Sequence, residues 1–438
     1  MKTEQSHLSS SSQLLVQPKD CTNPIFDKVL STLMIITISP LMVINVLFSL
    51  LSRHSLFCHF YKVDALGHLV VIHHFNSGIF RNSALLIDIL MGELSFCGVP
   101  FTHRLPKTVQ ANINRRYNAK PGLFSLFDLH QRTGLVVNNP EELLLKQLNL
   151  NAFENVLLLL KSLVCSCLYS RSSKTLIDTK KFSVFGLNLN NSSMKEAVDW
   201  ATVGVDNSSL DNLALDNVKT PTNIGFFINV NSINICLNQT DFHHTLQQAD
   251  MLLADGSGMR LAAKSAGYLL KDNTNGTDML PHLCRRCIEQ SKSLYFLGSK
   301  PDVAAKAALN LQKQFPELVI AGTQHGFIEP SQFQEQIKKI NGSGCDILLV
   351  AMGSPFQETW LLEHREQLHC QTALAVGGLF DFYSGDISRS PLWIRELGFE
   401  WVWRLLQEPM TKFKRYVIGN PLFLFRIYVL GLASKGVK

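Results

Sequence analysis

Residues 345–385 constrain the fold of this chain more than any other stretch. Apolar runs at 347–351 and 373–376 predict two buried strands. Between them lie a glycine loop and an amphipathic helix that begins at about Phe356. This is a strand–loop–helix–strand unit, and the small residues after each strand leave room for a ligand at the carboxyl edge of a parallel sheet.

The same alternation of strand and helix patterns extends from about residue 181. It predicts an open, mostly parallel, Rossmann-like sheet with helices on both faces. The expected strands are 226–230, 252–254, 293–297 and 318–321, and the expected helices include 245–251 and 302–315, the latter capped near Ser299 or Asp302.

At 438 residues the chain predicts two domains and an appendage. Hydrophobic residues make up 46% of the chain and charged residues only 17%. This composition is more apolar than that of an ordinary soluble protein and favours a membrane contact. Nine Lys and Arg against three acidic residues follow position 388, so the basic, aromatic carboxyl end suits anionic lipid or diphosphate, although a solvated tail explains the charge as well.

Ten cysteines without an even framework, and no cleavable signal peptide, predict reduced thiols in a cytoplasmic setting. His282, Cys284 and Cys287 lie close together, but no second ligand pair with zinc spacing follows them. No other ligand set is evident, so neither a metal nor a cofactor is required.

Residues 29–52 contain no charged side chain and are long enough to enter a membrane as a helix. Pro40 in the middle predicts a kink in this helix. Lys28 and Arg53 place one positive charge at each end, so charge does not indicate which end would face the cytoplasm. A re-entrant helix satisfies both observations, while a single spanning helix remains the alternative. Residues 156–168 predict either an interfacial helix or a buried one.

Several ordered blocks between residues 182 and 420 resemble the WecG/TagA/CpsF glycosyltransferases. They are NVN (229–231), LADGSG (253–258), NGTDMLP (275–281), YFLGSKP (295–301), GTQHGF, GSPFQE, GGLFDFYSGDISRSP and LGFEWVWRLLQEP. The resemblance implies transfer of an N-acetylmannosamine-type sugar, or its uronic acid, from UDP to a GlcNAc on polyprenyl diphosphate with inversion. No metal is implied.

The first half, at about 25–170, resembles the monotopic phosphoglycosyl transferases through MGELSFCGVP and RRYNAKPGLFSLFDLHQRTG. In that family an Asp-Glu pair supplies the nucleophile and a magnesium ligand, but Arg81 and Asn82 stand at the corresponding positions here. Guanidinium and amide groups cannot do that chemistry. We therefore expect a degenerate, membrane-associated α+β domain that serves as a mount.

Asp255 is the candidate catalytic base, because it follows an apolar strand at a glycine turn where burial raises a carboxyl pKa; an Asx turn or helix cap is the structural alternative. The candidate substrate-binding residues that follow strand patterns or glycine turns are Asn229, Asn231, Gly256, Thr277, Asp278, Gly298, Gly353, Gln357, Glu358, Gly378 and Asp381. For Asp278, capping of a helix that starts near Leu280 is equally plausible. Gln357 and Glu358 could instead lie on a helix surface, and Asp381 could pair with Arg389.

The appendage supplies Arg389, Arg395, Arg404 and Arg415 as candidate ligands of the donor and acceptor diphosphates. Expected partners are therefore a UDP-sugar, a polyprenyl-diphosphate-linked acceptor and the membrane, at the cytoplasmic face of the bacterial inner membrane. No nucleic acid is implied, and self-association into homo-oligomers is an expectation from the resemblance. A non-catalytic scaffold and a bifunctional phosphoglycosyl/glycosyl transferase are the alternatives.

These patterns predict a disordered segment at 1–24, the degenerate domain at 25–170 and a linker at 171–181. The α/β glycosyltransferase domain would then occupy 182–388 and the basic appendage 389–438.

Overall fold

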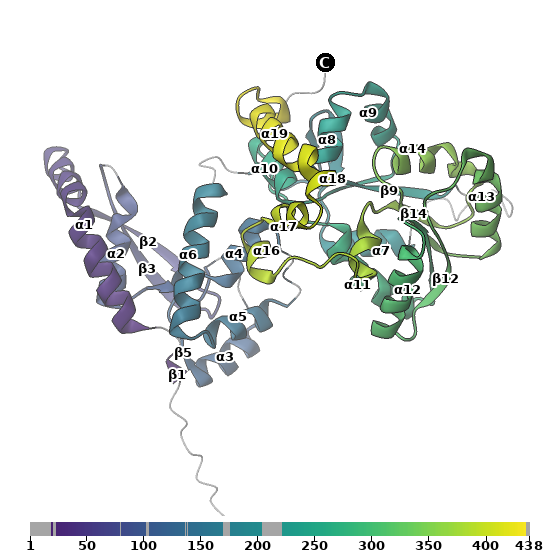
Figure 1. Cartoon of the computed structure of the whole chain (residues 1–438). Coiled ribbons are helices and arrows are strands. Elements are labelled where there is room, and N and C mark those ends of the chain that lie inside the picture. The colour runs from purple at the N-terminus through teal and green to yellow at the C-terminus, as the bar shows by residue number, and fades with distance from the viewer. Residues whose placement is uncertain are drawn as a thin grey trace, which may run out of the picture. The chain divides into compact units, whose positions relative to one another are not determined.

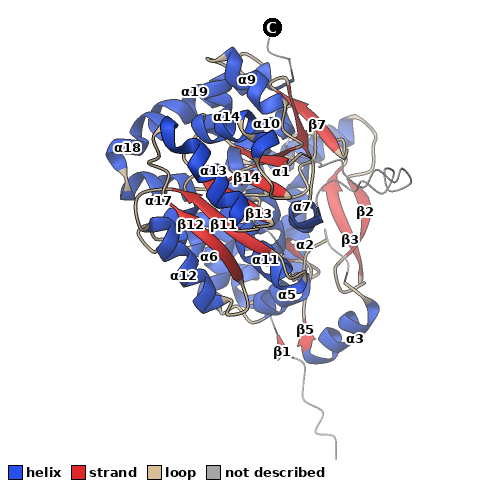
Figure 2. Ribbon diagram, turned by 90° about the vertical axis from the view of Figure 1, so that its right-hand side faces the viewer, coloured by secondary structure: helices blue, strands red, loops and turns tan. Residues whose placement is uncertain are grey.

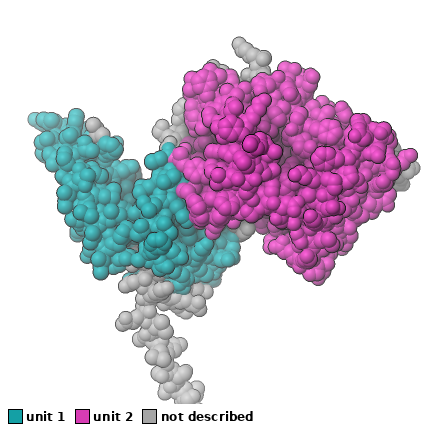
Figure 3. Space-filling view, viewed as in Figure 1, with its two compact units in different colours: residues 1–131, 137–167 teal, residues 132–136, 168–438 magenta. Residues whose placement is uncertain are grey.

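A computed structural model describes residues 19–20, 23–78, 80–101, 105–135, 137, 139–169, 176–203 and 221–434. The chain divides into two compact units, one of residues 1–131 with 137–167 and one of residues 132–136 with 168–438 (Figure 3). Residues 1–18 and 21–22 of the segment predicted to be disordered (1–24), and residues 171–175 of the predicted linker, lie outside the described residues.

The second unit is built on one eight-stranded sheet with the order β12-β11-β13-β14-β9-β10-β8-β7. All neighbours are parallel except β7 and β8, which form an antiparallel hairpin at one edge. The mostly parallel α/β sheet expected from the sequence is confirmed. Its strands are β7 (Lys181–Val184), β8 (Leu187–Asn190), β9 (Asn223–Ile228), β10 (Met251–Ala254), β11 (Ser293–Gly298), β12 (Val319–Gln324), β13 (Ile347–Ala351) and β14 (Thr372–Ala375).

The central strands are covered on both faces, which is why their sequences are continuously apolar. Every residue of β10, β13 and β14 is buried. One face carries α8 (Val230–Cys236), α9 (Thr240–Gln247), α10 (Ser257–Ser265), α13 (Phe333–Gly342), α14 (Phe356–Glu363) and α19 (Gly419–Tyr428). The other carries α7 (Met194–Val203), α11 (Gly276–Glu289), α12 (Val303–Gln314) and α15 (Leu379–Tyr383) (Figure 2).

The helices after two neighbouring strands leave for opposite faces of the sheet. Strand β9 is followed by α8 on one face, and β14, its parallel neighbour, is followed by α15 on the other. A crevice forms at the carboxyl ends of strands where the connections diverge in this way. This switch point is where the candidate site is built.

Several predicted boundaries of helices and strands are wrong. The strand expected at 226–230 ends at Ile228, because Asn229 caps α8. The helix expected at 245–251 ends at Gln247, and β10 begins at Met251.

Helix α11 begins at Gly276, before the expected start near Leu280, although it contains Pro281. Proline has no N–H to donate to the carbonyl four residues earlier. The Tyr383 hydroxyl donates to that carbonyl, on Thr277, at 2.9 Å, so a side chain from α15 replaces the missing backbone bond.

The first unit has an α+β composition. Its strands are β1 (Lys19–Asp20), β2 (Phe57–Val63), β3 (Leu69–Phe75), β4 (Ser95–Cys97), β5 (Tyr117–Asn118) and β6 (Gly122–Phe124). Its helices are α1 (Pro24–Leu51), the 3-10 helix η1 (Arg81–Ala84), α2 (Leu85–Met91), α3 (Lys107–Arg116), α4 (Leu126–Thr133, whose last two residues belong to the second unit), α5 (Pro140–Leu148) and α6 (Ala152–Leu168) (Figure 1).

Helix α1 buries its polar residues and exposes its apolar ones. Its buried residues are Asp27, Ser31, Asn45 and Ser49. Exposed positions carry large apolar side chains: Ile25, Val29, Leu33, Ile36, Val43, Leu47, Phe48, Leu50 and Leu51. The helix is long and apolar enough to cross a membrane, and it contains Pro40 without a break in its helical assignment.

Helix α6, which covers the predicted helix at 156–168, has one buried side and one exposed apolar side. Leu158, Leu159 and Cys165 are buried, whereas Leu160 and Leu163 on the other side are about half exposed. One side of the helix packs against the rest of the first unit, and the other side exposes apolar side chains to solvent.

Arg81 and Asn82 hold their own loop together. The Arg81 Nε donates to the Phe75 carbonyl at 2.7 Å, and the Asn82 Oδ1 lies 2.7 Å from His74 Nδ1. Both residues fold η1 onto β3, which is a structural role.

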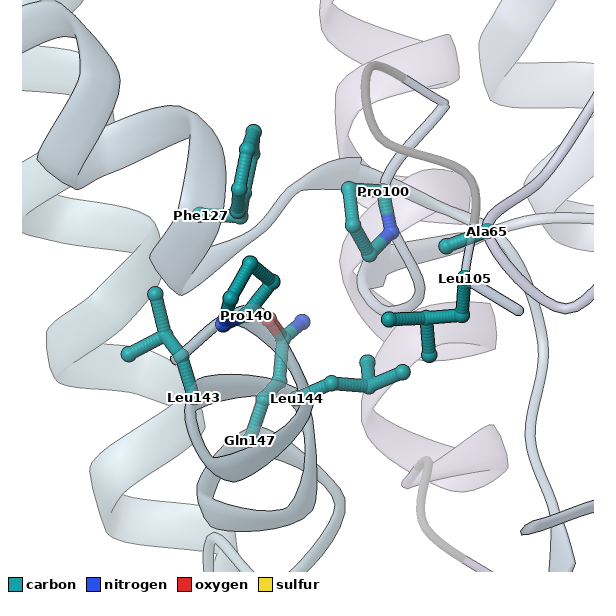
Figure 4. Close-up of a pocket in the computed structure, with 8 residues that line it drawn as sticks. All are labelled: Ala65, Pro100, Leu105, Phe127, Pro140, Leu143, Leu144 and Gln147. Carbon is teal, nitrogen blue, oxygen red and sulfur yellow. The ribbon is translucent and has the colours of Figure 1, made fainter. Parts of the chain in front are cut away.

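A small pocket in the first unit is lined almost entirely by apolar side chains (Figure 4). The lining residues are Ala65, Pro100, Leu105, Phe127, Pro140, Leu143, Leu144 and Gln147. None of these side chains titrates, so the pocket offers no acid or base for catalysis.

Candidate active site at the carboxyl edge of the sheet

Asp255 and Asn229 meet because their strands are parallel neighbours in register. Ala254 of β10 lies beside Ile228 of β9, and each strand ends there. The Asn229 Nδ2 donates to Asp255 Oδ2 at 3.4 Å, while its Oδ1 accepts the backbone N–H groups of the first turn of α8. Asn229 therefore orients Asp255 and caps a helix, which leaves little of its amide for a substrate.

The environment of Asp255 suits a general base. Burial raises its pKa above that of an ordinary aspartate, and nearby Asp278 raises it further. The hydrogen bond from Asn229 and the positive charge of Arg415 act in the opposite direction. The residue keeps partial contact with solvent, so a proton acceptor of raised basicity stands where a substrate can reach it.

Gly256 follows in a left-handed conformation, with φ of 91° and no atom within 4 Å of the position where a Cβ would stand. Its N–H donates to Asn273 Oδ1 at 2.6 Å, and the Thr274 hydroxyl donates to the Ala254 carbonyl at 3.3 Å. Asn273 and Thr274 thus hold the loop that carries Asp255. Neither was a candidate, because no local pattern reveals a contact made 17 residues away.

Gln357 joins two loops of the site. Its Oε1 accepts the N–H groups of Gly353, after β13, and of Gly377, after β14, both at 3.1 Å. Only 2% of the residue is exposed. Gln357 therefore positions the loops around the crevice, and the surface-helix alternative is wrong.

Glu358 is buried to the same extent, so a surface position is wrong for it too. Its Oε1 accepts from the Ser354 hydroxyl at 2.6 Å and from Gln357 Nε2 at 2.9 Å. Its Oε2 is buried and has no hydrogen-bond partner, and burial raises its pKa. Glu358 therefore supports the loop after β13 from inside the protein.

Asp381 pairs with Arg404 and Ser299; the alternative pairing with Arg389 is wrong. The Arg404 Nη2 lies 3.0 Å from Asp381 Oδ2, and the Ser299 hydroxyl donates to Oδ1 at 2.7 Å. Ser299 follows Gly298, where any Cβ would collide with the backbone of Ala351. Asp302 precedes α12 without a side-chain cap, so the predicted cap is not formed.

Arg389 forms an ion pair with Asp278 and lies 3.6 Å from a carboxylate oxygen of Glu400. Asp278 also accepts from Asn275 Nδ2, and Asn275, not Asp278, caps α11. The two charged candidates therefore neutralise each other and fasten the appendage to α11. The backbone carbonyl of Thr277 accepts the hydrogen bond that the Tyr383 hydroxyl donates.

Arg404 is 7% exposed and is held between Asp381 and Glu408, with Glu408 Oε2 at 2.7 Å from its Nε. A Cβ added to Gly378 would stand 3.2 Å from both Arg404 and Asp381, so this glycine makes room for the pair. Arg404 anchors α17 (Glu400–Gln407) to the sheet edge through these two carboxylates, while its Nη1 is buried with no hydrogen-bond partner among the described residues.

Arg395 and Arg415 are the two candidate arginines that form no ion pair with a described carboxylate. Among the described residues, neither has a carboxylate within 4.0 Å. Arg395 lies in the last turn of α16 (Leu392–Glu396) and acts on Glu400, whereas Arg415 lies in the π-helical turn Lys414–Ile418 and acts on Asp255. Asn231, in the first turn of α8, likewise has a side chain with no hydrogen-bond partner in this part of the structure.

Within the described ranges, no group of three or more His, Cys, Asp or Glu side chains could hold a metal ion. Cys284 and Cys287 lie on the buried side of α11, in an apolar cluster, and burial raises the pKa of both thiols.

Residues 182–436 match the sequence profile of the glycosyl transferase WecG/TagA/CpsF family. This span is more than half of the chain and contains every residue of the site described above. An N-acetylglucosaminyldiphosphoundecaprenol N-acetyl-beta-D-mannosaminyltransferase of Bacillus spizizenii is 30% identical to the chain over 168 residues. The match covers 38% of this chain and 65% of that relative, slightly less than two thirds of its length.

Proposed function

Because the chain belongs to the WecG/TagA/CpsF glycosyltransferase family, we propose that it transfers an N-acetylmannosamine-type sugar, or its uronic acid, from UDP to a GlcNAc on polyprenyl diphosphate. The reaction would take place at the cytoplasmic face of the membrane, in cell-surface polysaccharide biosynthesis. The observation that carries the proposal is that Asp255, a carboxyl whose pKa is raised by burial, stands beside Asn229 where the neighbouring strands β9 and β10 end.

In this reaction Asp255 removes the proton from the acceptor hydroxyl. The hydroxyl oxygen then bonds to the anomeric carbon of the donor sugar as the bond from that carbon to the UDP oxygen breaks. Attack from the side opposite the leaving group inverts the anomeric configuration. The raised pKa of Asp255 supports its role as base, and the hydrogen bond from Asn229 keeps its carboxylate oriented.

The leaving UDP takes up the electron pair, so positive groups near it lower the barrier. Arg395 and Arg415 suit this task, because neither is neutralised by a carboxylate within 4.0 Å among the residues that the structure describes. Arg389 and Arg404 instead tie the appendage to Asp278 and Asp381. We assign them to positioning, in place of the diphosphate contact expected from the sequence.

Membrane attachment is supported in each unit separately. In the first unit, α1 presents its apolar side chains outward. In the second, exposed apolar residues gather on α18 (Pro409–Phe413), on α19 and on the turn between them; they are Met410, Phe413, Val417, Ile418, Leu422, Leu424, Phe425 and Tyr428. Such surfaces mixed with Lys and Arg are typical of lipid interfaces.

The proposal is tested with the full chain purified in detergent. UDP-sugars are offered with a synthetic polyprenyl-diphosphate-GlcNAc acceptor, and the released nucleotide is identified. The proposal expects UDP and a disaccharide product with one donor. Release of UMP with polyprenyl phosphate would indicate phosphoglycosyl transfer, and binding of UDP-sugars without turnover would indicate a scaffold.

A further inference from the structure

Two hydroxyl groups hold the turn that joins α16 to α17. The Tyr169 hydroxyl donates to the carbonyl of Leu397 at 3.3 Å, and the Ser257 hydroxyl donates to the carbonyl of Gly398 at 3.3 Å. No backbone N–H of the described residues donates to either carbonyl. Within this part of the chain, both carbonyls are therefore satisfied by side chains from elsewhere in the second unit, to which Tyr169 belongs.

The backbone of the turn leaves space for the tyrosine. Gly398 has a φ of 75°, and its N–H donates to the Arg395 carbonyl at 2.9 Å, where α16 ends. A Cβ at this position would collide with the Tyr169 hydroxyl. Glycine is therefore needed here both for the left-handed backbone and for the close approach of Tyr169.

Ser257 links this turn to the loop that carries the candidate base. It is the first residue of α10 and follows Asp255 by two positions. The intervening Gly256 is held by its hydrogen bond to Asn273. One side-chain hydrogen bond thus connects the loop of Asp255 to the turn at Gly398.

The turn also sets the position of Arg395. This arginine lies in the last turn of α16, two residues before Leu397, and a helix of only five residues does not hold its orientation by itself. Its Nε is buried without a hydrogen-bond partner, and no described carboxylate lies within 4.0 Å of its guanidinium. An unused guanidinium donor is suited to a phosphate oxygen. On the other side of the turn, Arg395 acts on Glu400, the first residue of α17.

We propose that Tyr169 and Ser257 are positioning residues, whose hydrogen bonds to the turn at 397–398 hold Arg395 beside the diphosphate of the UDP-sugar while UDP leaves. The assignment of Arg395 to the donor rests on the proposed function, whereas the two hydrogen bonds do not. Tyr169 precedes the span 182–436 that matches the family profile, so the profile does not include this contact.

The first measurement is hydrogen–deuterium exchange of the full chain, which does not depend on activity. In Tyr169→Phe and in Ser257→Ala, the amides of α16 and α17 should exchange at least about threefold faster than in the wild type, because the turn loses a hydrogen bond. The amides of α12 should be unaffected. Unchanged exchange in α16 and α17 would overturn the proposal.

Tyr268→Phe and Ser265→Ala are the matched controls. Tyr268 is a partly buried tyrosine and Ser265 an exposed serine on α10, and neither side chain has a hydrogen bond among the described residues. Both variants should exchange and turn over as the wild type does. Equally fast exchange of α16 and α17 in the controls would show that any loss of a hydroxyl loosens these helices, and would overturn the assignment to Tyr169 and Ser257.

The second measurement is steady-state transfer from the UDP-sugar. Tyr169→Phe and Ser257→Ala should each lower kcat about 3- to 10-fold, with the KM for the acceptor unchanged. Arg395→Gln should lower kcat at least about 10-fold, because it removes a positive charge from the leaving group. A higher acceptor KM at constant kcat, or full activity of Arg395→Gln, would overturn the role at the donor.

A double-mutant cycle shows whether the two hydroxyls act through Arg395. In an Arg395→Gln background, Tyr169→Phe and Ser257→Ala should lower kcat less than about twofold further. The same loss in both backgrounds would mean that the hydroxyls act by another route, and would overturn the proposal. If exchange changes as expected but the wild type transfers no sugar, the two contacts stand, while the proposed function and the role of Arg395 fall.

Discussion

At the scale of single residues, the site depends on side chains that orient Asp255 as much as on Asp255 itself. Asn229 donates to its carboxylate, and Asn273 accepts the N–H of Gly256 next to it. The apolar run and glycine turn around Asp255 were visible in the sequence. Asn273 was not, because its partner is 17 residues away and only the return of the chain after α10 brings them together.

Replacing Asn273 with alanine should leave the Gly256 N–H without its acceptor and loosen the catalytic loop. Loss of a buried hydrogen-bond partner costs about 1–3 kcal/mol. We expect kcat to fall roughly 10-fold, a 1.4 kcal/mol effect on the barrier, with little change in donor KM. Steady-state kinetics check this, with Asn238→Ala, in the turn after α8, as the control. A donor KM that rises while kcat stays constant would contradict a positioning role.

The raised pKa of Asp255 predicts opposite effects on activity and stability. The base works only when deprotonated, so kcat should rise with pH through a pKa above the roughly 4 of a free aspartate. A carboxyl whose folded pKa is raised stabilises the fold below its unfolded pKa, and this contribution is lost as pH rises through the folded pKa.

The neutral variant Asp255→Asn should therefore be inactive yet have a higher Tm than the wild type at pH 7. The difference should shrink as the wild-type carboxyl protonates on acidification. Differential scanning calorimetry between pH 4 and pH 8 measures this. A lower Tm for the variant at pH 7 would mean that Asp255 is stabilised when charged.

At the scale of elements, the site consists of the loops that follow five parallel strands and that hydrogen bonds and ion pairs hold together. These strands are β9, β10, β11, β13 and β14. The strand of 347–351 was predictable, because a continuous apolar run predicts a fully buried strand. The helix after it was expected to be amphipathic, but α14 buries Gln357 and Glu358 together with apolar residues. The early start of α11 was not, because Pro281 argues against it locally and the compensating hydroxyl comes from Tyr383, over 100 residues later. The pairing of Arg389 with Asp278 and of Arg404 with Asp381 was likewise set by the tertiary fold.

Tyr383→Phe should remove the donor that satisfies the Thr277 carbonyl. One hydrogen bond contributes about 0.5–1.5 kcal/mol, so the free energy of unfolding should fall by about 1 kcal/mol. Tyr428→Phe, at a residue that is 61% exposed, is the control. Urea denaturation followed by circular dichroism compares the two, and equal stabilities would show that water satisfies the carbonyl instead.

At the scale of the whole molecule, the chain combines a family domain with a first unit for which we propose a role in membrane attachment. In that unit α1 reverses the usual polarity, burying Ser31, Asn45 and Ser49 and exposing leucine and isoleucine. The apolar run predicted a membrane helix, but only the structure shows which side of the helix the protein covers. That distinction matters because a helix in a soluble core would bury its apolar side chains and expose its polar ones.

Leu33→Lys combined with Ile36→Lys should weaken attachment to the membrane without unfolding the protein. Both side chains are more than half exposed, so packing is preserved, while two charges would enter the lipid. Flotation with phospholipid vesicles should show most of the variant left unbound. Leu309→Lys, at an exposed position on α12, should float as the wild type does; unchanged flotation of the double variant would remove α1 as an anchor.

The proposed sugar transfer depends on removal of a proton by the Asp255 carboxylate. The rate of UDP release by Asp255→Ala tests this dependence. With the matched UDP-sugar and a polyprenyl-diphosphate-GlcNAc acceptor, the variant should release UDP at least 100-fold more slowly than the wild type, within the range of acid–base effects. Its circular dichroism spectrum and its affinity for UDP should stay the same. Turnover by Asp255→Ala within a factor of two or three of the wild type, in a folded protein, would contradict the account.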